Sequence, residues 1–351
     1  MTSPYEDLLA GTDLGEFADD PRPGWAGPAL LFGGRQCQIG ALPAVEVVVA
    51  GVPFDATASS RPGAAEGPAA IRQASLVFSS YVDSLGEHDM YDMRSGDRFR
   101  YRKRDLVDIG DLHVYPTDPL RTFRAVAAEV RHLASRADML VLLGGDHSIS
   151  FPTFAGWSAA RLAANPDIRL GYVQIDHHFD FGDTSAIHGK LYHGSNARRI
   201  SELAGMAPCR IAFLGQGSVT RQGQFDALQR DGYHIVSARE IRTRGAEAAL
   251  SGVLAALRAN CDMIYLSLDI DVLDTSVAPG TGNVTLGGLD GGALLDVTAL
   301  LADLPIGAVD IAEVAPRYDP SGRTAQIAAR ILFELLYRHA VAVQHGSEGG
   351  E

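Results

Sequence analysis

The sequence has few cysteines and no long apolar run, and each shortage excludes a class of protein. Only three cysteines occur in 351 residues, at positions 37, 209 and 261. Three widely spaced cysteines exclude a disulfide framework and a metal site built on cysteine pairs. No apolar stretch reaches the roughly 20 residues of a membrane helix, and the first twenty residues are acidic where a secretory signal is basic. We therefore expect a cytoplasmic protein with no membrane partner.

Positive charge is also in short supply. The 30 lysines and arginines are outnumbered by 43 aspartates and glutamates, which gives a formal net charge of −13. A nucleic-acid binder needs a basic face to displace counterions, so we expect no nucleic-acid partner and favour a small cationic one. The hydrophobic fraction of 46% is that of a globular protein with a sizeable core.

Short apolar runs alternate with longer amphipathic segments along most of the chain. Continuous Val, Ile and Leu content is typical of strands buried on both faces, and the runs are 46–52, 105–110, 139–145, 170–176, 210–215, 234–238, 263–269 and 307–314. Apolar residues three and four apart predict helices over 69–80, 118–136, 248–260 and 324–343. We predict an α/β fold, a three-layer α/β/α sandwich with a mainly parallel sheet.

The two ends of the chain differ in composition from the middle. Residues 1–45 are rich in glycine, proline and aspartate, which predicts an irregular N-terminal arm. Residues 345–351 are polar and predict a flexible tail. Because no composition break divides the region between them, we expect residues 46–344 to form a single domain.

Polar residues cluster where four predicted strands end, which is where parallel α/β sheets bind ligands. These residues are Gly144-Gly145-Asp146-His147-Ser148, Asp176-His177-His178-Phe179-Asp180, Asp269-Ile270-Asp271 and Glu313. Because alternate residues of an extended strand share a face, we expect Asp176, His178 and Asp180 to project together, and likewise Asp269 and Asp271.

This clustering predicts a metal site. A single Asp-x-Asp pair or a lone histidine is more often a helix cap or a turn residue, but their joint occurrence on successive strand ends has no simple structural explanation. Several carboxylates in one cleft need cations to neutralise them. Carboxylates mixed with imidazole suit manganese or a neighbouring first-row metal.

In this order the motifs resemble those of the ureohydrolase, or arginase/agmatinase, family. The metal motifs are GGDHS (144–148), Asp-x-His-x-Asp (176–180) and Ser-x-Asp-x-Asp-x-x-Asp (267–274), and the likeness extends to GVPFD (51–55), RPG (61–63), GPAAIR (67–72), DIGD (108–111), HGS (193–195), APGTG (278–282) and EVAPRYD (313–319). The resemblance implies an eight-stranded, mainly parallel α/β/α sandwich that assembles as a homo-oligomer, either a trimer or a hexamer.

The resemblance also implies two Mn²⁺ ions per subunit, with nickel or cobalt as alternatives. One ion would be bound by His147, Asp176, Asp180 and Asp269. The other would be bound by Asp176, His178, Asp269 and Asp271, so that Asp176 and Asp269 bridge the two ions.

The implied reaction is hydrolysis of a guanidino group to urea and an amine. Guanidinium is a poor electrophile, and a water shared by two divalent cations has a pKa low enough to supply a strong nucleophile. Asp180 would orient that nucleophile, and Glu313 would hold the guanidinium group. His193 would donate a proton to the departing amine, with His188 as the alternative donor.

Some positions depart from the family pattern and bear on the substrate. Arginases hold the α-amino and α-carboxylate groups with an Asn and a Ser at positions that here are Gly182 and Gly189. We therefore expect an agmatinase-like enzyme acting on agmatine, a guanidino acid or a related compound. Two alternatives stay open: hydrolysis of a formimino or other amidine group by the same centre, and a binding paralogue without turnover.

Overall fold

The computed structural model describes residues 29–84, 90–91, 93, 98–99 and 103–337. The predicted tail at 345–351 and most of the predicted N-terminal arm lie outside the described residues. The part of the arm that is described holds short 3-10 turns and the strand β1 (Arg35–Gln36).

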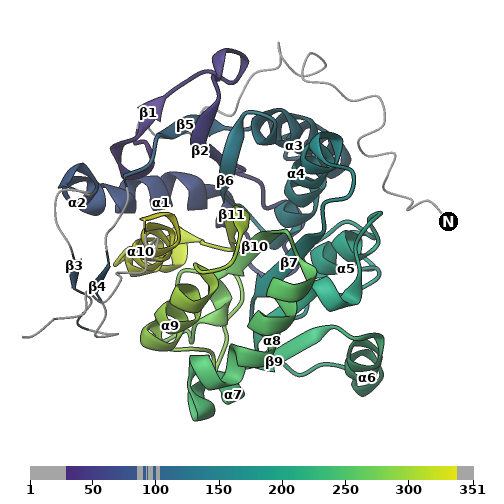
Figure 1. Cartoon of the computed structure of the whole chain (residues 1–351). Helices are drawn as coiled ribbons and strands as arrows, with labels where there is room; N and C mark the ends of the chain where they lie inside the picture. Colours follow the sequence, from purple (N-terminus) through teal and green to yellow (C-terminus); the bar gives the residue numbers. More distant parts are fainter. Residues whose placement is uncertain (1–28, 85–89, 92, 94–97, 100–102, 338–351) are drawn as a thin grey trace, which may run out of the picture.

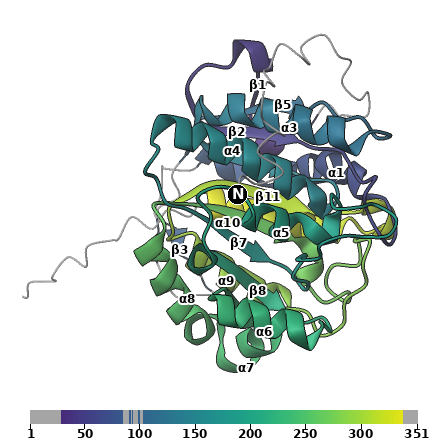
Figure 2. The ribbon, with the colours of Figure 1, turned by 90° about the vertical axis from the view of Figure 1, so that its right-hand side faces the viewer.

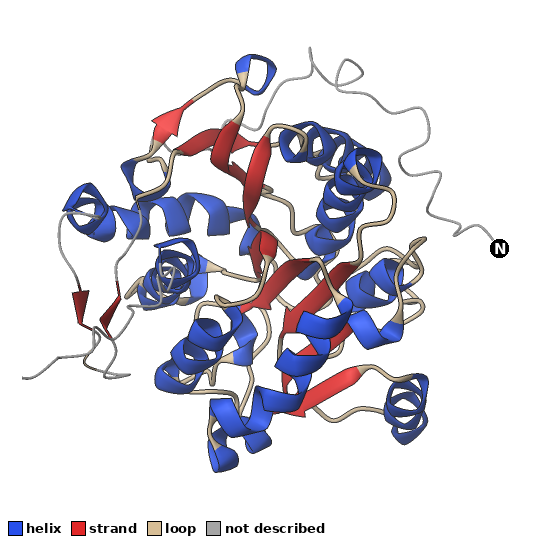
Figure 3. Cartoon of the chain, in the orientation of Figure 1, coloured by secondary structure: helices blue, strands red, loops and turns tan. Residues whose placement is uncertain are grey.

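A nine-stranded parallel sheet runs through the middle of the molecule (Figures 1 and 3). In spatial order its strands are β1, β5 (Leu106–Asp111), β2 (Val45–Gly51), β6 (Ala137–Leu143), β11 (Ile306–Ala312), β10 (Met263–Asp269), β7 (Leu170–Ile175), β8 (Ile211–Gln216) and β9 (His234–Ser237). All eight predicted strands are present, and β1 adds a ninth by pairing with β5. A separate antiparallel pair, β3 (Met90–Tyr91) and β4 (Arg98–Phe99), lies outside the sheet.

Helices cover both faces of the sheet, which confirms the predicted three-layer α/β/α sandwich (Figures 1 and 2). One layer contains α1 (Gly67–Ser75), α7 (Ala238–Arg244), α8 (Ala246–Asn260), α9 (Gly291–Leu301) and α10 (Arg323–Tyr337). The other contains α3 (Pro119–Ala134), α4 (Ser150–Ala164), α5 (Asn196–Ser201) and α6 (Gln222–Asp231). The helix predicted over 69–80 is divided, because a 3-10 turn separates α1 from α2 (Ser79–Ser84). Within the described residues, no helix is both long and apolar enough to cross a bilayer.

Alternation along the strands explains why their apolar runs are continuous. In β2, Val47 and Val49 pack into the core beneath α9 and α10, whereas Val48 and Ala50 pack into the core beneath α3 and α4. A strand covered by helices on both faces is therefore apolar at nearly every position.

A buried charged cluster ties the first helix to the sheet. The Arg72 guanidinium donates to Asp108 at 2.9 and 3.0 Å and to Asp111 at 2.5 Å. Asp108 also accepts the backbone N–H of Leu31 at 2.9 Å. Arg72 and Asp108 are almost fully buried, where an unpaired charge would be strongly destabilising. This pairing gives the GPAAIR and DIGD motifs a structural role.

Candidate metal centre

Four neighbouring central strands bring the predicted ligands together. β6, β11, β10 and β7 are adjacent and parallel, so their carboxyl ends meet at one edge of the sheet. His147 follows β6 in a 3-10 turn, Asp269 ends β10, and Asp271 lies in the next 3-10 turn. Asp176 comes directly after β7.

The expected reason for this convergence needs a correction. Strand alternation was expected to align Asp176, His178 and Asp180, but β7 ends at Ile175 and these residues lie in a bent loop. Asp180 has a φ of +46°, in the left-handed region that non-glycine residues rarely adopt. The convergence therefore depends on loop geometry.

The first group of possible ligands surrounds one nitrogen of a fully buried histidine. Nδ1 of His147 lies 2.9 Å from Asp180 Oδ2 and 3.2 Å from both Asp176 Oδ2 and Asp269 Oδ2. Among the described residues this nitrogen has no partner with hydrogen-bond geometry. The four side chains are placed to share a metal ion.

The second group shares Asp176 with the first. Nδ1 of His178 lies 3.4 Å from Asp176 Oδ1 and 3.2 Å from Asp271 Oδ2. These three residues form a second set of possible metal ligands. Asp269, expected as a bridging ligand to both ions, appears in the first set alone, and its Oδ1 accepts the backbone N–H of Asp271 at 2.8 Å.

The electrostatics of the cluster suit a cation. Burial and the neighbouring Asp271 and Asp176 raise the pKa of Asp269 well above its usual value. Burial also raises the pKa of Asp271 to about 6. Although burial opposes its charge, hydrogen bonding to Asp176 and Asp271 raises the pKa of His178 to about 12. The metal-free cluster therefore retains protons that a divalent cation would displace.

Further side chains hold the ligands in position. Nε2 of His147 lies 2.9 Å from Ser267 Oγ, and Ser267 donates to the buried carboxylate of Asp310 at 2.8 Å. These two hydrogen bonds place an N–H on Nε2 of His147 and leave the lone pair of Nδ1 facing the cluster. Gln174 donates to Asp176 Oδ2 at 2.7 Å, and Asn196 donates to Asp180 Oδ2 at 3.0 Å.

A glutamate and a histidine lie beside the cluster. Glu313 Oε1 accepts the backbone N–H of His147 at 2.9 Å and lies 2.9 Å from Nδ1 of His193. On the other side of the imidazole, Nε2 is 2.6 Å from Ser59 Oγ and 3.1 Å from the Ser59 nitrogen. Although burial lowers it, the hydrogen bond with Glu313 raises the pKa of His193 to about 9. Glu313 has a φ of +64°, a strained conformation of the kind often found at functional sites.

The alternative proton donor lies in a different environment. His188 belongs to a small loop closed by backbone hydrogen bonds between Ser185 and Gly189, and its own N–H donates to Ser185 Oγ at 3.4 Å. His193, in contrast, contacts Glu313 directly.

At Gly182, where arginases have an Asn, the Tyr192 side chain fills the space that a side chain would need. A Cβ atom at Gly182 would lie 2.1 Å from the Tyr192 hydroxyl. A larger residue at 182 would therefore require Tyr192 to move.

Several residues that contact the site lie outside the predicted set. Gln174 precedes Asp176 by two positions, and Asn196 follows His193 by three, so both could have been found from strand and helix spacing. Ser59 gave no local signal, because it reaches the site from a distant segment of the chain, whereas Asp310 lies within the predicted strand 307–314, three positions before Glu313.

Comparison with known proteins agrees with this geometry. The model of the arginase family matches residues 45–337. A mitochondrial guanidino acid hydrolase of Homo sapiens is 30% identical over 82% of this chain and 76% of its own length. An agmatinase of Salmonella paratyphi B is 32% identical over 84% of this chain and 87% of its own. Among solved structures, proclavaminate amidino hydrolase from Streptomyces clavuligerus has a TM-score of 0.72 and 26% identity, with 90% of this chain and 97% of that chain covered.

Proposed function

We propose that this chain, which belongs to the arginase family and is a hydrolase of C–N bonds in guanidino compounds, uses a two-metal centre to release urea from a guanidino substrate other than arginine. The family predicted from the motifs is thereby confirmed, and the relatives fit an agmatinase-like enzyme better than an arginase. The observation that carries the proposal is that two ligand groups share Asp176 and lie beside the Glu313–His193 pair.

The proposed ligands are those expected from the motifs: His147, Asp176, His178, Asp180, Asp269 and Asp271. Their mixture of carboxylate oxygen and imidazole nitrogen fits Mn²⁺, with nickel or cobalt as alternatives. Two such cations would supply the reaction with a nucleophile, by lowering the pKa of a shared water, and with charge that stabilises the tetrahedral transition state.

The protein supplies orientation and proton transfer. Asp180, held by Asn196, accepts a hydrogen bond from the nucleophile and aims it at the guanidino carbon. Oε1 of Glu313 accepts the backbone N–H of His147 and contacts the imidazole of His193. Its other oxygen, Oε2, lies toward Gly282 of the APGTG segment. That oxygen is placed to accept a guanidinium N–H.

The last step breaks the bond between the guanidino carbon and the nitrogen of the tail. The leaving nitrogen keeps the bonding electron pair and takes a proton from His193, and urea and a free amine result. Hydrogen bonding to Glu313 raises the pKa of His193 to about 9, which favours the protonated form that a general acid needs.

The residues around the centre support a substrate other than arginine. Gly182 and Gly189 provide no side chain for an amino-acid head group, and Tyr192 fills the space beside Gly182. A guanidino acid or agmatine fits this proposal.

Other features of the proposal concern the whole protein. We propose a domain over 46–344, a trimeric or hexameric assembly and a cytoplasmic location, the last supported by three free cysteines.

The proposal is tested by incubating the manganese-loaded protein with agmatine, 4-guanidinobutyrate, 3-guanidinopropionate, arginine and N-formiminoglutamate, and measuring urea and formamide. Urea from a guanidino compound other than arginine is expected, and Asp269→Ala should abolish it with loss of metal. The exposed Asp138→Asn serves as a control. Formamide alone would identify an amidine hydrolase, and neither product would favour a paralogue without turnover.

A further inference from the structure

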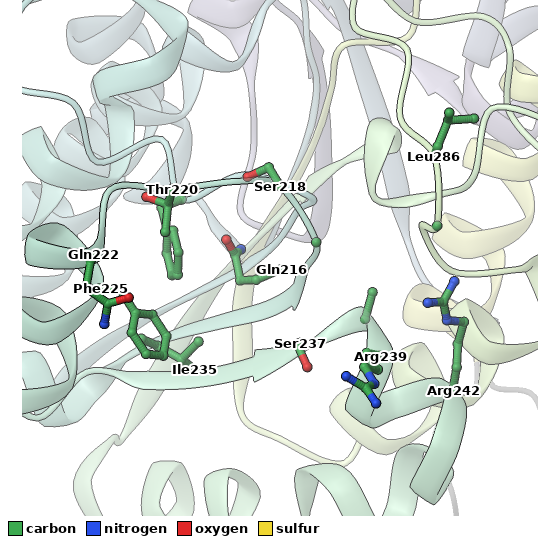
Figure 4. A pocket seen from close by; sticks show the side chains of 14 residues that line it. Gln216, Ser218, Thr220, Gln222, Phe225, Ile235, Ser237, Arg239, Arg242 and Leu286 are labelled. Carbon is green, nitrogen blue, oxygen red and sulfur yellow. The ribbon is translucent and has the colours of Figure 1, made fainter.

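A cavity of about 500 Å³ lies at the carboxyl ends of β8 and β9, at the edge of the sheet next to the metal centre (Figure 4). The end of β8, the loop after it and the start of α7 line the cavity, together with Leu286 and Gly287. None of the proposed metal ligands lines it, and neither do His193 and Glu313. The proposed reaction therefore leaves this cavity without a role.

The cavity lies against the loop that carries the metal ligands. Phe179, between His178 and Asp180, lines the cavity and packs on Phe213 with ring centroids 5.3 Å apart. Its two neighbours belong to the metal-ligand groups. The cavity and the metal centre thus share one loop.

Gln216 connects the cavity to the same loop. Its Nε2 donates to the backbone carbonyls of Asp176 at 3.1 Å and His178 at 2.9 Å. Because two carbonyl oxygens can be contacted only by the NH₂ group, the orientation of the amide is determined.

The amide oxygen of Gln216 is left without a donor. The residue is only 7% exposed and lines the cavity, and within the described part of the chain Oε1 has no hydrogen-bond partner. A buried acceptor without a donor is unfavourable. A ligand carrying an N–H or O–H group would satisfy it.

The charge of the cavity is opposite to that of the protein as a whole. The charged side chains of its lining are Arg239 and Arg242, with no aspartate or glutamate among the lining residues, in a chain of net charge −13. Asp274 is near Arg242, but its carboxylate is bonded to Ser276 and Gly287.

The rest of the lining suits a short hydrocarbon chain. Phe179, Phe225 and Ile235 supply apolar surface, and Ser218 and Thr220 supply hydroxyl groups. Apolar surface combined with convergent polar groups is found in small-molecule sites.

We propose that this cavity binds a small carboxylate that also carries a hydroxyl or amine group, with the carboxylate at Arg239 and Arg242 and the donor at Oε1 of Gln216. Binding would add a hydrogen bond to the Gln216 amide, whose NH₂ group already holds two carbonyls of the metal-ligand loop, and would thereby stabilise that loop. This site is distinct from the site of the proposed hydrolysis.

Titration calorimetry with the metal-loaded full chain and three probes of similar length tests the carboxylate contact and the donor contact separately. 4-Hydroxybutyrate has both groups, butyrate lacks the donor, and 1,4-butanediol lacks the carboxylate. We expect saturable binding of 4-hydroxybutyrate and weaker binding of the other two. Equal affinity for all three probes, or no saturable heat with any, would overturn the proposal.

Matched arginine variants on one helix locate the site. Arg239 is exposed and lines the cavity, whereas Arg244, also exposed and on α7, does not. Arg239→Gln should weaken 4-hydroxybutyrate binding about tenfold, or about 1.4 kcal/mol, and Arg244→Gln should leave it unchanged. Equal affinity of the two variants would contradict the assignment.

Two further measurements separate this cavity from the reaction cleft. Binding should be the same in Glu313→Gln, whereas a probe held in the cleft would respond to that change and not to Arg239→Gln. Saturating 4-hydroxybutyrate should also slow metal loss to a chelator in the unmodified chain, but not in Arg239→Gln. An unchanged rate of metal loss would overturn the proposed coupling to the metal loop.

Discussion

Replacing Asp310 with asparagine perturbs the metal centre without touching a ligand. Asp310 is fully buried and accepts hydrogen bonds from Ser267 at 2.8 Å and Tyr265 at 2.7 Å. Ser267 in turn lies 2.9 Å from Nε2 of His147. Asparagine has the same shape but is neutral and has only one acceptor oxygen, so both donors lose a charged partner and one of them faces an NH₂ group instead of an acceptor.

The size of the effect follows from these contacts. A hydrogen bond to a charged group contributes about 1.5 to 3 kcal/mol, and Tyr265 can turn to Thr153 Oγ1, 2.7 Å away. We therefore expect Asp310→Asn to lower the free energy of unfolding by about 1.5 kcal/mol, the lower end of that range. Loss of the support behind a metal-binding histidine should weaken metal affinity by about 10- to 100-fold.

Chemical denaturation and a competitive metal-chelator titration measure the two effects. Asp138→Asn is a suitable control, because Asp138 is an exposed residue of β6. If Asp310→Asn kept both the metal affinity and the stability of the unmodified protein, Ser267 and Asp310 would not position His147.

Three further predictions concern protons at the site. As the proton donor, His193 acts in its protonated form, so kcat should fall as pH rises through about 9, and at a lower pH where bound cations repel the proton. His193→Ala should slow turnover while metal stays bound. If His188→Ala has this effect and His193→Ala does not, His188 is the proton donor. Ser59→Ala removes a contact to the imidazole, so it should lower kcat roughly tenfold and shift that limb of the pH profile to lower pH. Ser251→Ala, at an exposed position of α8, is the control, and an unchanged profile in Ser59→Ala would contradict a positioning role. Burial raises the pKa of Asp271 to about 6, so metal affinity should fall as pH falls below about 6. Calorimetry in buffers of different ionisation enthalpy should show proton release on metal binding. A metal affinity that does not change with pH would contradict this prediction.

The strands could be predicted from the sequence more completely than the helices. Strands buried on both faces are marked by continuous apolar runs, but α4 is buried almost all around and shows no amphipathic period. Short helices such as α5 and α7 leave too few residues for a pattern. β1 is an exposed Arg-Gln pair with no apolar signal, and its assignment depends on pairing with β5.

The candidate site could be predicted at the level of residue types, but not of contacts. Asp176 and Asp269 can be identified because they lie at the carboxyl ends of buried strands, Asp176 directly after β7 and Asp269 as the last residue of β10. The turn that places Asp180 at a positive φ depends on tertiary structure and has no sequence signal of its own. Ser59 meets His193 across 134 positions of sequence, and a single sequence does not reveal such a contact.

The proposed reaction depends most on both ligand groups holding a metal ion during turnover. Urea release from the preferred guanidino substrate should be measured while manganese is added stepwise to the metal-free protein, with bound metal determined by elemental analysis. We expect activity to rise until two ions per subunit are bound. The Asp271→Ala variant should bind fewer than two ions per subunit and show little activity. Full activity at one ion per subunit, or urea release without metal, would contradict it.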